Sequence, residues 1–280
     1  KSSSLFNCYY CYVNLLGNEA GRMIFDGEIL LAKEGKLLAR NQLLSFQDYQ
    51  VFSFYLENKP QHLAHIQPKE WEFAQASALG LYDYLRKSKS KGFVLSLSGG
   101  ADSSSIAVLV AEMVRRGIHE LGVEKFVEKS GIQLTHGSNN PEKELVNQLL
   151  TTAYQGTRNS SDDTFQSAKN LAESLGAQFY AWTIDEEVTS YTEKIETALG
   201  RKLTWETDDL ALQNIQARSR SPIIWLLTNI KNALLLSTSN RSEGDVGYAT
   251  MDGDTSGSIS PIAAVDKHFI LHWLRWAEKN

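Results

Sequence analysis

The chain has 280 residues, a formal charge of -5 from 28 Lys+Arg against 33 Asp+Glu, and an apolar share of 42%. This length and apolar content allow one large domain or two ordinary ones with buried cores. The slightly acidic balance favours a small-molecule partner over nucleic acid or an anionic membrane. No apolar run approaches the roughly 18 residues of a membrane-spanning helix, and no signal-peptide pattern opens the chain, so we expect a cytoplasmic location.

The first sixty residues are typical of β structure. Strands are predicted at 9–15, 22–25, 28–32, 36–39 and 49–55, separated by glycine-containing turns. The two cysteines, Cys8 and Cys11, form one C-x-x-C with no second pair or histidine cluster nearby, which is half of a zinc ligand set. We therefore interpret both as strand residues.

A domain boundary is predicted in the proline-containing stretch 56–68, because apolar residues then recur at helical spacing from Trp71 to Leu85. The next segment, 93–105, is an apolar strand, a small-residue turn and the start of a helix. Adjacent glycine amides ahead of a helix N-terminus favour a polyphosphate ligand. The expected contacts are the amides of Gly99 and Gly100, the hydroxyls of Ser98, Ser103 and Ser104, and Mg²⁺ on Asp102.

This turn has neither the G-x-x-x-x-G-K-[ST] nor the G-x-G-x-x-G spacing, and a bare glycine turn capped by Ser or Asp is the alternative. The following helix is predicted to end at 115–117, and 119–148 reads as a helical insertion. Strands at 149–154 and 177–184 flank a helix at 163–175, with Ser160 and Ser161 either capping it or touching the nucleotide. Strands alternating with helices predict a parallel sheet whose ligands lie beyond the carboxyl ends of its strands.

The last third of the chain holds two further polar segments. Asn214 and Arg218 lie at i,i+4 on one helix face, which is either a binding face or an exposed polar one. A strand at 233–237 runs into a polar loop at 238–243, which should bring Glu243 to the same crevice as Asp102. Asp252 and Asp254, in a glycine-rich stretch, are either solvated turn residues or part of the site.

Five sequence patterns carry family resemblances. Ser-Gly-Gly-Ala-Asp-Ser at 98–103 resembles the loop of the ATP pyrophosphatases, and with Asn-Ile-Gln-Ala-Arg at 214–218 and Ser-Thr-Ser-Asn-Arg-Ser-Glu at 237–243 it resembles the NAD⁺ synthetases. Val-Asn-Leu-Leu-Gly-Asn-Glu at 13–19 and Phe-Asp-Gly at 25–27 resemble the C-terminal half of a nitrilase-type amidase. The whole is similar to the glutamine-dependent synthetase family.

That resemblance implies a doubly wound parallel α/β sheet, adenine nucleotide alpha-hydrolase-like, at 63–280. It is preceded at 1–62 by the β-rich C-terminal part of an α/β nitrilase-like glutaminase domain. The amidase family's Glu-Lys-Cys triad lies upstream of the matched strands, so neither cysteine is expected to be a nucleophile. The chain is then either a fragment or one part of a longer parent.

The resemblance further implies a ligase that adenylates deamido-NAD⁺ with ATP and Mg²⁺, releases pyrophosphate, and displaces AMP with ammonia, which a longer protein would draw from glutamine. Mg²⁺ would lie between Asp102 and Glu243, Thr238 would contact ATP, and Asp254 would orient ammonia. Asn214, Arg218 and Glu243 are the candidates for binding deamido-NAD⁺.

A homo-oligomer built on a dimer is expected, with an apolar helix face as interface or, alternatively, as core: Ile223, Ile224, Trp225, Leu227 and Ile230. The alternatives to this family are another adenylating ATP pyrophosphatase, either GMP synthetase-like or a tRNA-modifying ligase, and a non-catalytic nucleotide-binding protein.

Overall fold

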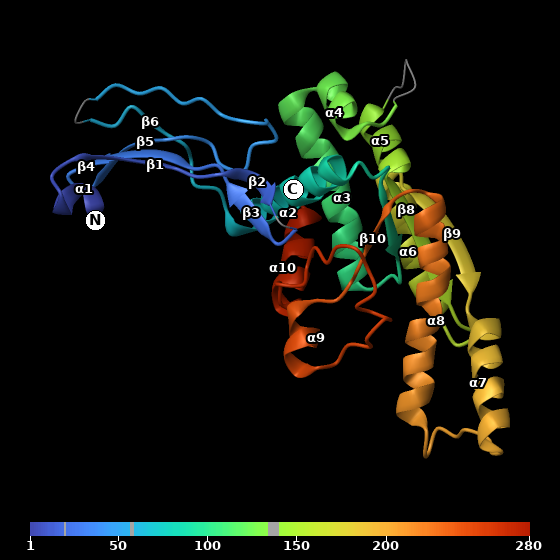
Figure 1. Ribbon diagram of the computed structural model, residues 1–280. Coiled ribbons are helices and arrows are strands. Elements are labelled where there is room, and N and C mark those ends of the chain that lie inside the picture. Colours follow the sequence, from blue (N-terminus) through green and yellow to red (C-terminus); the bar gives the residue numbers. More distant parts are fainter. Residues whose placement is uncertain (20, 57–58, 134–139) are drawn as a thin grey trace. The chain divides into compact units, whose positions relative to one another are not determined.

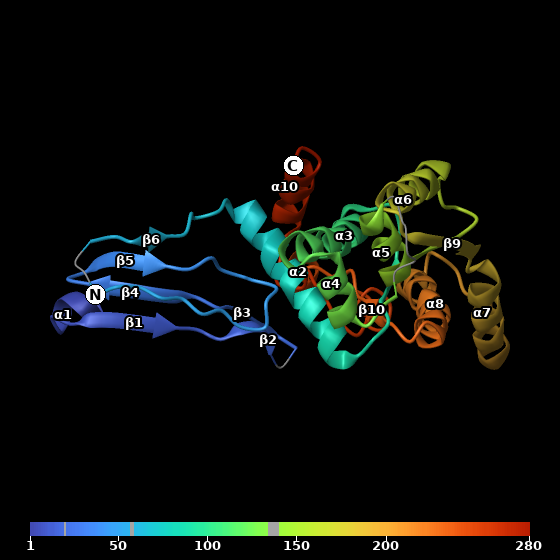
Figure 2. The same ribbon diagram turned by 90° about the horizontal axis from the view of Figure 1, so that it is seen from above.

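A computed structural model describes residues 1–19, 21–56, 59–133 and 140–280 (Figures 1 and 2). The chain divides into two compact units. The first comprises Lys1–Ser88 and Glu112–Ser130, and the second comprises Lys89–Ala111 and Gly131–Asn280. Helix α3, Ala101–Leu121, contributes residues to both. This division follows packing, and the predicted domain boundary between residues 62 and 63 stays a prediction.

The first unit is built around an antiparallel sheet of strand order β1-β4-β5-β6, in which only β5 and β6 run parallel, and a separate β2-β3 hairpin. Helix α2 packs against the hairpin and against α4. The elements are α1 Ser2–Leu5, β1 Tyr9–Val13, β2 Leu16–Glu19, β3 Met23–Asp26, β4 Ile29–Lys33, β5 Lys36–Arg40, β6 His62–Leu63, α2 Lys69–Ser88 and α4 Val123–Ser130.

The strand predicted at 49–55 is wrong, since no strand forms there. Phe52 and Phe54 do alternate inward, where they pack against the sheet core of Leu31, Leu38 and Ala39. The alternating pattern therefore indicates which side chains of this segment are buried, but the backbone does not pair with a neighbouring strand. Cys11 lies in β1 as predicted, whereas Cys8 precedes it, and both thiols are free.

The predicted end of α3 at 115–117 is also wrong, because the helix continues to Leu121. A Cβ on Gly117 would lie 2.4 Å from the Phe126 ring, so this glycine permits close packing of α4 rather than ending a helix. The Phe126 ring stacks on Tyr82 of α2 with centroids 5.6 Å apart. The left-handed residue that follows the helix is Gly122, with φ +81°.

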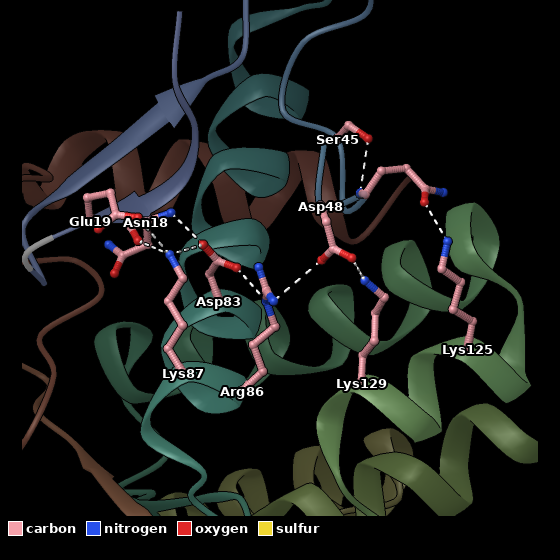
Figure 3. A network of polar contacts seen from close by, with 10 residues as sticks. Asn18, Glu19, Ser45, Asp48, Asp83, Arg86, Lys87, Lys125 and Lys129 are labelled. Carbon is pink, nitrogen blue, oxygen red and sulfur yellow. Dashed lines mark hydrogen bonds and ion pairs between the residues drawn. The ribbon is translucent and has the colours of Figure 1, made fainter. Parts of the chain in front are cut away.

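Figure 3 shows the polar network that surrounds the end of α2. Asp83 has a side chain only 3% exposed and accepts hydrogen bonds from the backbone N–H of Asn18 (2.7 Å) and from Arg86 Nε (2.6 Å). Lys87 Nζ lies 3.1 Å from the same carboxylate. Asp48, more exposed, pairs with Lys129. The buried carboxylate of Asp83 thus joins the β2-β3 hairpin to α2.

The second unit has a parallel sheet of strand order β10-β7-β8-β9, which confirms the predicted α/β architecture. Helix α8 packs on β7 and β10, and α6 packs on β8 and β9. The elements besides α3 are β7 Phe93–Ser96, α5 Pro141–Leu149, β8 Leu150–Gly156, α6 Asp162–Leu175, β9 Gln178–Thr183, α7 Asp185–Leu199, α8 Asp209–Ile230, β10 Leu234–Leu236, α9 Arg241–Val246 and α10 Lys267–Ala277.

The helix face considered for dimerisation belongs largely to this unit's core. Ile224 is 3% exposed and clusters with Val94 and Leu235, and Trp225 and Leu227 pack against that cluster. Ile230 is the one exposed residue of the five, at 72%. The core interpretation therefore holds for three of the five residues. Helices α4 and α5 lie in the predicted helical insertion, of which 134–139 lie outside the described residues. None of the described helices is long and apolar enough to cross a membrane.

Candidate active site

The turn after β7 is held together by its own hydroxyls. Ser103, only 2% exposed, accepts a hydrogen bond from the Ser98 N–H and lies 3.2 Å from the Gly100 carbonyl oxygen, to which it donates. Gly99 has φ +81°, and a Cβ there would lie 2.5 Å from the Thr164 carbonyl oxygen. The turn is therefore preformed, with Ser98 and Gly100 exposed at its tip. Ser103 shapes the turn, while the exposed Ser98 hydroxyl accepts the Gly100 N–H at 3.3 Å and lies 3.2 Å from Ser103 Oγ.

Asp102 lies in the first turn of α3, in a cluster of polar side chains from three elements. Its carboxylate forms an ion pair with Lys267, the first residue of α10, and accepts a hydrogen bond from Asn240 Nδ2 at 3.1 Å. Asn240 is 2% exposed and caps α9 by accepting the Glu243 N–H at 3.0 Å. Residues 138 and 165 positions apart thus meet at the N-terminus of α3.

Glu243 lies in the first turn of α9 and not in a loop as predicted. Its carboxylate accepts the backbone N–H of Asn240 at 3.3 Å, which completes a capping box. Burial raises the pKa of Glu243 above its ordinary value, and the negative charge of Asp102 raises it further. The two predicted metal ligands are therefore close enough to influence each other, with Asn240 bonded to both.

A crevice of about 400 Å³ opens at the carboxyl ends of β7 and β8. It brings together three of the predicted site residues, Ser98, Thr238 and Asp254. The backbone carbonyl of Asp254 accepts a hydrogen bond from Ser237 Oγ at 3.0 Å. The residues that line it are Ser96, Leu97, Ser98, Ala153, Tyr154, Gln155, Ser160, Ser161, Thr164, Arg220, Thr238 and Asp254. Ser161 caps α6 by accepting the Thr164 N–H, so it serves as a cap and also borders the crevice.

Asn214 and Arg218 lie on one face of α8, as predicted, and both contact the turn at 250–251. Asn214 Oδ1 accepts Thr250 Oγ1 at 2.9 Å, and Arg218 Nε donates to the Met251 carbonyl at 2.9 Å. Asp254 accepts the Thr250 N–H at 3.2 Å. These contacts hold the glycine-rich segment against α8, and neither Asn214 nor Arg218 lines the crevice.

Asn240, Lys267 and Arg220 are the polar site residues that sequence reasoning missed. The first had a signal, because Ser-Asn-Arg-Ser-Glu at 239–243 contains the spacing of a capping box. Lys267 follows Asp266, a helix cap ahead of an apolar run, but its partner across the fold is 165 positions away. Nothing local distinguished Arg220 from the arginine two positions before it.

The donor set suits a magnesium ion that arrives with a nucleotide. Over the described ranges 1–19, 21–56, 59–133 and 140–280, no group of three or more His, Cys, Asp or Glu is arranged to hold a metal. Mg²⁺ in nucleotide enzymes commonly takes only one or two carboxylates, with substrate phosphates and water as its other ligands. Asp102 and Glu243 fit that pattern, provided that Lys267 yields its place on Asp102.

Comparisons with known proteins identify the family of a segment that covers most of the second unit and part of the first. A glutamine-dependent NAD⁺ synthetase from Cytophaga hutchinsonii is 57% identical and superposes with a TM-score of 0.91 over 99% of this chain and 48% of that one. The enzyme of the same name from Oryza sativa subsp. indica is 28% identical over 96% of this chain and 45% of its own length.

A more distant structure, the glutamine-dependent NAD⁺ synthetase of Acinetobacter baumannii in complex with ADP, is 21% identical with a TM-score of 0.75 over 98% of this chain and 46% of that one, and it supports the fold. The chain thus spans about half the length of the relatives it matches. Residues 73–278 match the NAD synthase family model, a span that contains the turn after β7, the capped α9 and the crevice between them. The chain therefore belongs to the NAD synthase family.

Proposed function

We propose that this chain carries out the ATP-dependent amidation of deamido-NAD⁺ to NAD⁺ through an adenylated intermediate, with release of pyrophosphate and AMP. The observation that carries the proposal is the meeting of Asp102, Asn240 and Glu243 beside a preformed glycine turn, in a chain that matches the NAD synthase family over 73–278. A strand-end crevice of this kind is where parallel α/β sheets bind ligands.

The residues of the chain can be given roles in the adenylation step. The nicotinate carboxylate of deamido-NAD⁺ attacks the α-phosphorus of ATP, and the bond to the bridging oxygen of the β-phosphate breaks with its electrons on pyrophosphate. The exposed tip of the turn, with Ser98 and the Gly100 amide, would hold the departing pyrophosphate. Lys267 Nζ, which pairs with Asp102 in this structure and would give up that place to the metal, would supply a further positive charge to the pyrophosphate.

Magnesium would be held by Asp102 and Glu243, and when bound it would supply neutralisation of charge on the leaving pyrophosphate. Burial and the negative charge of Asp102 raise the pKa of Glu243, so a cation bound beside it would favour its ionised form. Catalysis would then depend on positioning and electrostatics, with no covalent nucleophile on the protein.

The second step replaces AMP by ammonia. We assign Asp254 to orienting ammonia, since it lines the crevice with Thr238, for which we keep the role of contacting ATP. Asn214 and Arg218 stay the proposed contacts for deamido-NAD⁺, at the turn 250–251 beside the crevice. We also retain a dimer as the oligomeric unit, with the exposed Ile230 of the predicted α8 face as a candidate contact.

The test is ATP–pyrophosphate exchange. Purified protein with ATP, Mg²⁺ and labelled pyrophosphate should form labelled ATP only when deamido-NAD⁺ is present, and NAD⁺ should not replace it because its amide cannot attack phosphorus. Exchange without deamido-NAD⁺, or with xanthosine monophosphate or tRNA instead, would favour another adenylating ATP pyrophosphatase. Nucleotide binding with no exchange would favour the non-catalytic alternative.

The nitrogen source can be tested with the same protein. Residues 1–62 contain no position that matches the amidase family's Glu-Lys-Cys triad, so these 280 residues alone should form NAD⁺ with ammonium and not with glutamine. The rate should rise with pH as the fraction of NH₃ increases. Glutamine-driven synthesis that is lost on alkylation of Cys8 or Cys11 would contradict this expectation.

A further inference from the structure

Arg220 is a cation inside the crevice that has no assigned role. It lies on α8 two positions after Arg218 and borders the crevice with Ser98, Thr238 and Asp254. Its Nε donates to the Gln155 backbone carbonyl at 3.1 Å and its Nη1 to the Gln216 backbone carbonyl at 3.0 Å. Both acceptors are neutral, so they fix the plane of the guanidinium without neutralising its charge.

The charge of Arg220 is poorly compensated. Among the ion pairs of the described residues none includes Arg220, although most other arginines of this unit are paired with a carboxylate. Burial lowers the pKa of its guanidinium, and the nearby charge of Asp254 only opposes that effect. A partly desolvated cation with carbonyl partners is stabilised when an anion binds beside it.

The order of the strands fixes where along a bound nucleotide this cation lies. The cluster of Asp102, Asn240 and Lys267 lies at the β7 and β10 end of the sheet, beside the turn proposed to hold pyrophosphate. At the β8 and β9 end a second cavity, of about 410 Å³, is lined by the aromatic side chains of Tyr154, Phe165 and Trp182.

The two ends are joined at β8, where Gln155 anchors Arg220 and where Tyr154 borders both cavities. An aromatic cavity suits a base, and the glycine turn suits the terminal phosphates. A nucleotide spanning from one to the other must pass the carboxyl end of β8 with the phosphate nearest its ribose. That phosphate is the one attacked in the proposed reaction.

We propose that Arg220 binds the α-phosphate of ATP, and then the phosphate of the adenylate, as a catalytic residue at the reacting phosphorus. This inference rests on the proposed function. When the carboxylate oxygen attacks and pyrophosphate leaves, negative charge grows on the non-bridging oxygens of the α-phosphate. The guanidinium, held in place by its backbone contacts, stabilises that negative charge and stays protonated throughout the step.

The test separates the two halves of ATP. Arg220→Gln should weaken the binding of AMP by roughly 10- to 100-fold, the range of a lost hydrogen bond to a charged group, and should leave the binding of inorganic pyrophosphate unchanged. The kcat of ATP–pyrophosphate exchange should fall by at least as much. Arg201→Gln is the matched contrast, because its guanidinium is 52% exposed, pairs with Asp208 and does not line the crevice, so its loss should leave AMP affinity unchanged.

Arg220→Lys is a second variant in case Arg220→Gln does not fold, and thermal melting followed by circular dichroism checks that each variant is folded. The lysine keeps the charge but cannot keep both backbone anchors, so AMP affinity should fall between those of the unsubstituted protein and Arg220→Gln. Unchanged AMP affinity in either folded variant, or a loss confined to pyrophosphate, would overturn the assignment. Failure of deamido-NAD⁺-dependent exchange in the unsubstituted protein would instead refute the proposed function, while the AMP and pyrophosphate measurements would still decide whether Arg220 is a phosphate site.

Discussion

Strands β8 and β1 show how differently the two units use the same kind of element. All seven residues of β8 are buried, although its sequence, Leu-Thr-Thr-Ala-Tyr-Gln-Gly, is rich in polar side chains. All five residues of β1 are exposed, although Tyr-Tyr-Cys-Tyr-Val is mostly aromatic. Composition alone does not decide burial, since β8 lies between two strands and packs against α5 and α6, whereas β1 lies at the edge of its sheet.

Polar side chains of β8 form hydrogen bonds in the interior, although Gln155 Oε1 has no partner among the described residues. Thr152 Oγ1 donates to the Gln178 carbonyl at 2.7 Å, and Gln155 Nε2 donates to Ser96 Oγ at 2.5 Å. A satisfied hydrogen bond removes most of the cost of burying a polar group. The exposed aromatic edge of β1 is the kind of surface that another strand or segment covers in longer proteins. The second unit therefore places the candidate site on a buried strand, whereas the first unit leaves an edge strand exposed beside its core of Leu31, Leu38 and Ala39.

The largest expected effect tests whether chemistry belongs to the second unit. Asp102→Asn should lower deamido-NAD⁺-dependent ATP–pyrophosphate exchange by about 10²- to 10³-fold, because it removes the charge that meets Lys267 and the proposed cation. Asp245→Asn, a change of equal charge at an exposed position of α9, is the control and should keep full exchange. Full exchange in Asp102→Asn at saturating Mg²⁺ would remove the metal assignment.

The next prediction tests how closely the glycine turn is packed. Gly99→Ala should destabilise the second unit by roughly 3 kcal/mol, since it combines a left-handed φ with a Cβ that meets the Thr164 carbonyl oxygen. Gly200→Ala, also left-handed at φ +67° but with open space around it, should cost only about 1 kcal/mol. Urea unfolding followed by tryptophan fluorescence measures both, and equal losses would mean that the contact with Thr164 is unimportant.

A third pair of substitutions tests the network of the first unit. Asp83→Ala should cost about 2 kcal/mol of unfolding free energy, because it leaves the Asn18 N–H and two cations without their buried acceptor. Asp48→Ala removes a carboxylate that is 52% exposed, and the expected cost is below about 1 kcal/mol. Thermal unfolding of the two variants compares them directly. A greater loss of stability in Asp48→Ala than in Asp83→Ala would show that burial does not determine the contribution of Asp83 to stability.

The smallest effect is a pH dependence at Glu243. The pKa of Glu243 is raised in the folded protein, so above the ordinary carboxyl value of 4.5 the native protein binds more protons than the unfolded chain. The contribution of this carboxyl group to stability therefore falls as the pH rises from 4.5 through the raised folded-state pKa. Glu243→Gln should therefore raise stability at neutral pH by less than about 1 kcal/mol once solvent screening is allowed for. The gain should vanish as pH approaches 4.5. A gain in stability that persists at low pH would have a cause other than the titration of Glu243.

Much of the second unit could be predicted from the sequence, because its signals are local. The strand, turn and helix of 93–113, the helix of α6 with its Ser161 cap, and the left-handed glycines all follow from nearby residues. The two errors in the first unit had a common cause. Phe52 and Phe54 alternate, and Gly117 interrupts a helix pattern, because each packs against another element of the unit, which the pattern of the segment itself does not show.

The sequence by itself determined the parallel α/β class, the glycine turn and the carboxylates Asp102 and Glu243, since each depends on residue type and short spacing. Only the tertiary structure decided that Asn240 bonds to both carboxylate residues, that Lys267 pairs with Asp102, and that Arg220 rather than Arg218 borders the crevice. Those contacts join positions up to 165 residues apart or depend on the rotation of one helix about its axis. Neither property leaves a pattern that short-range spacing can show.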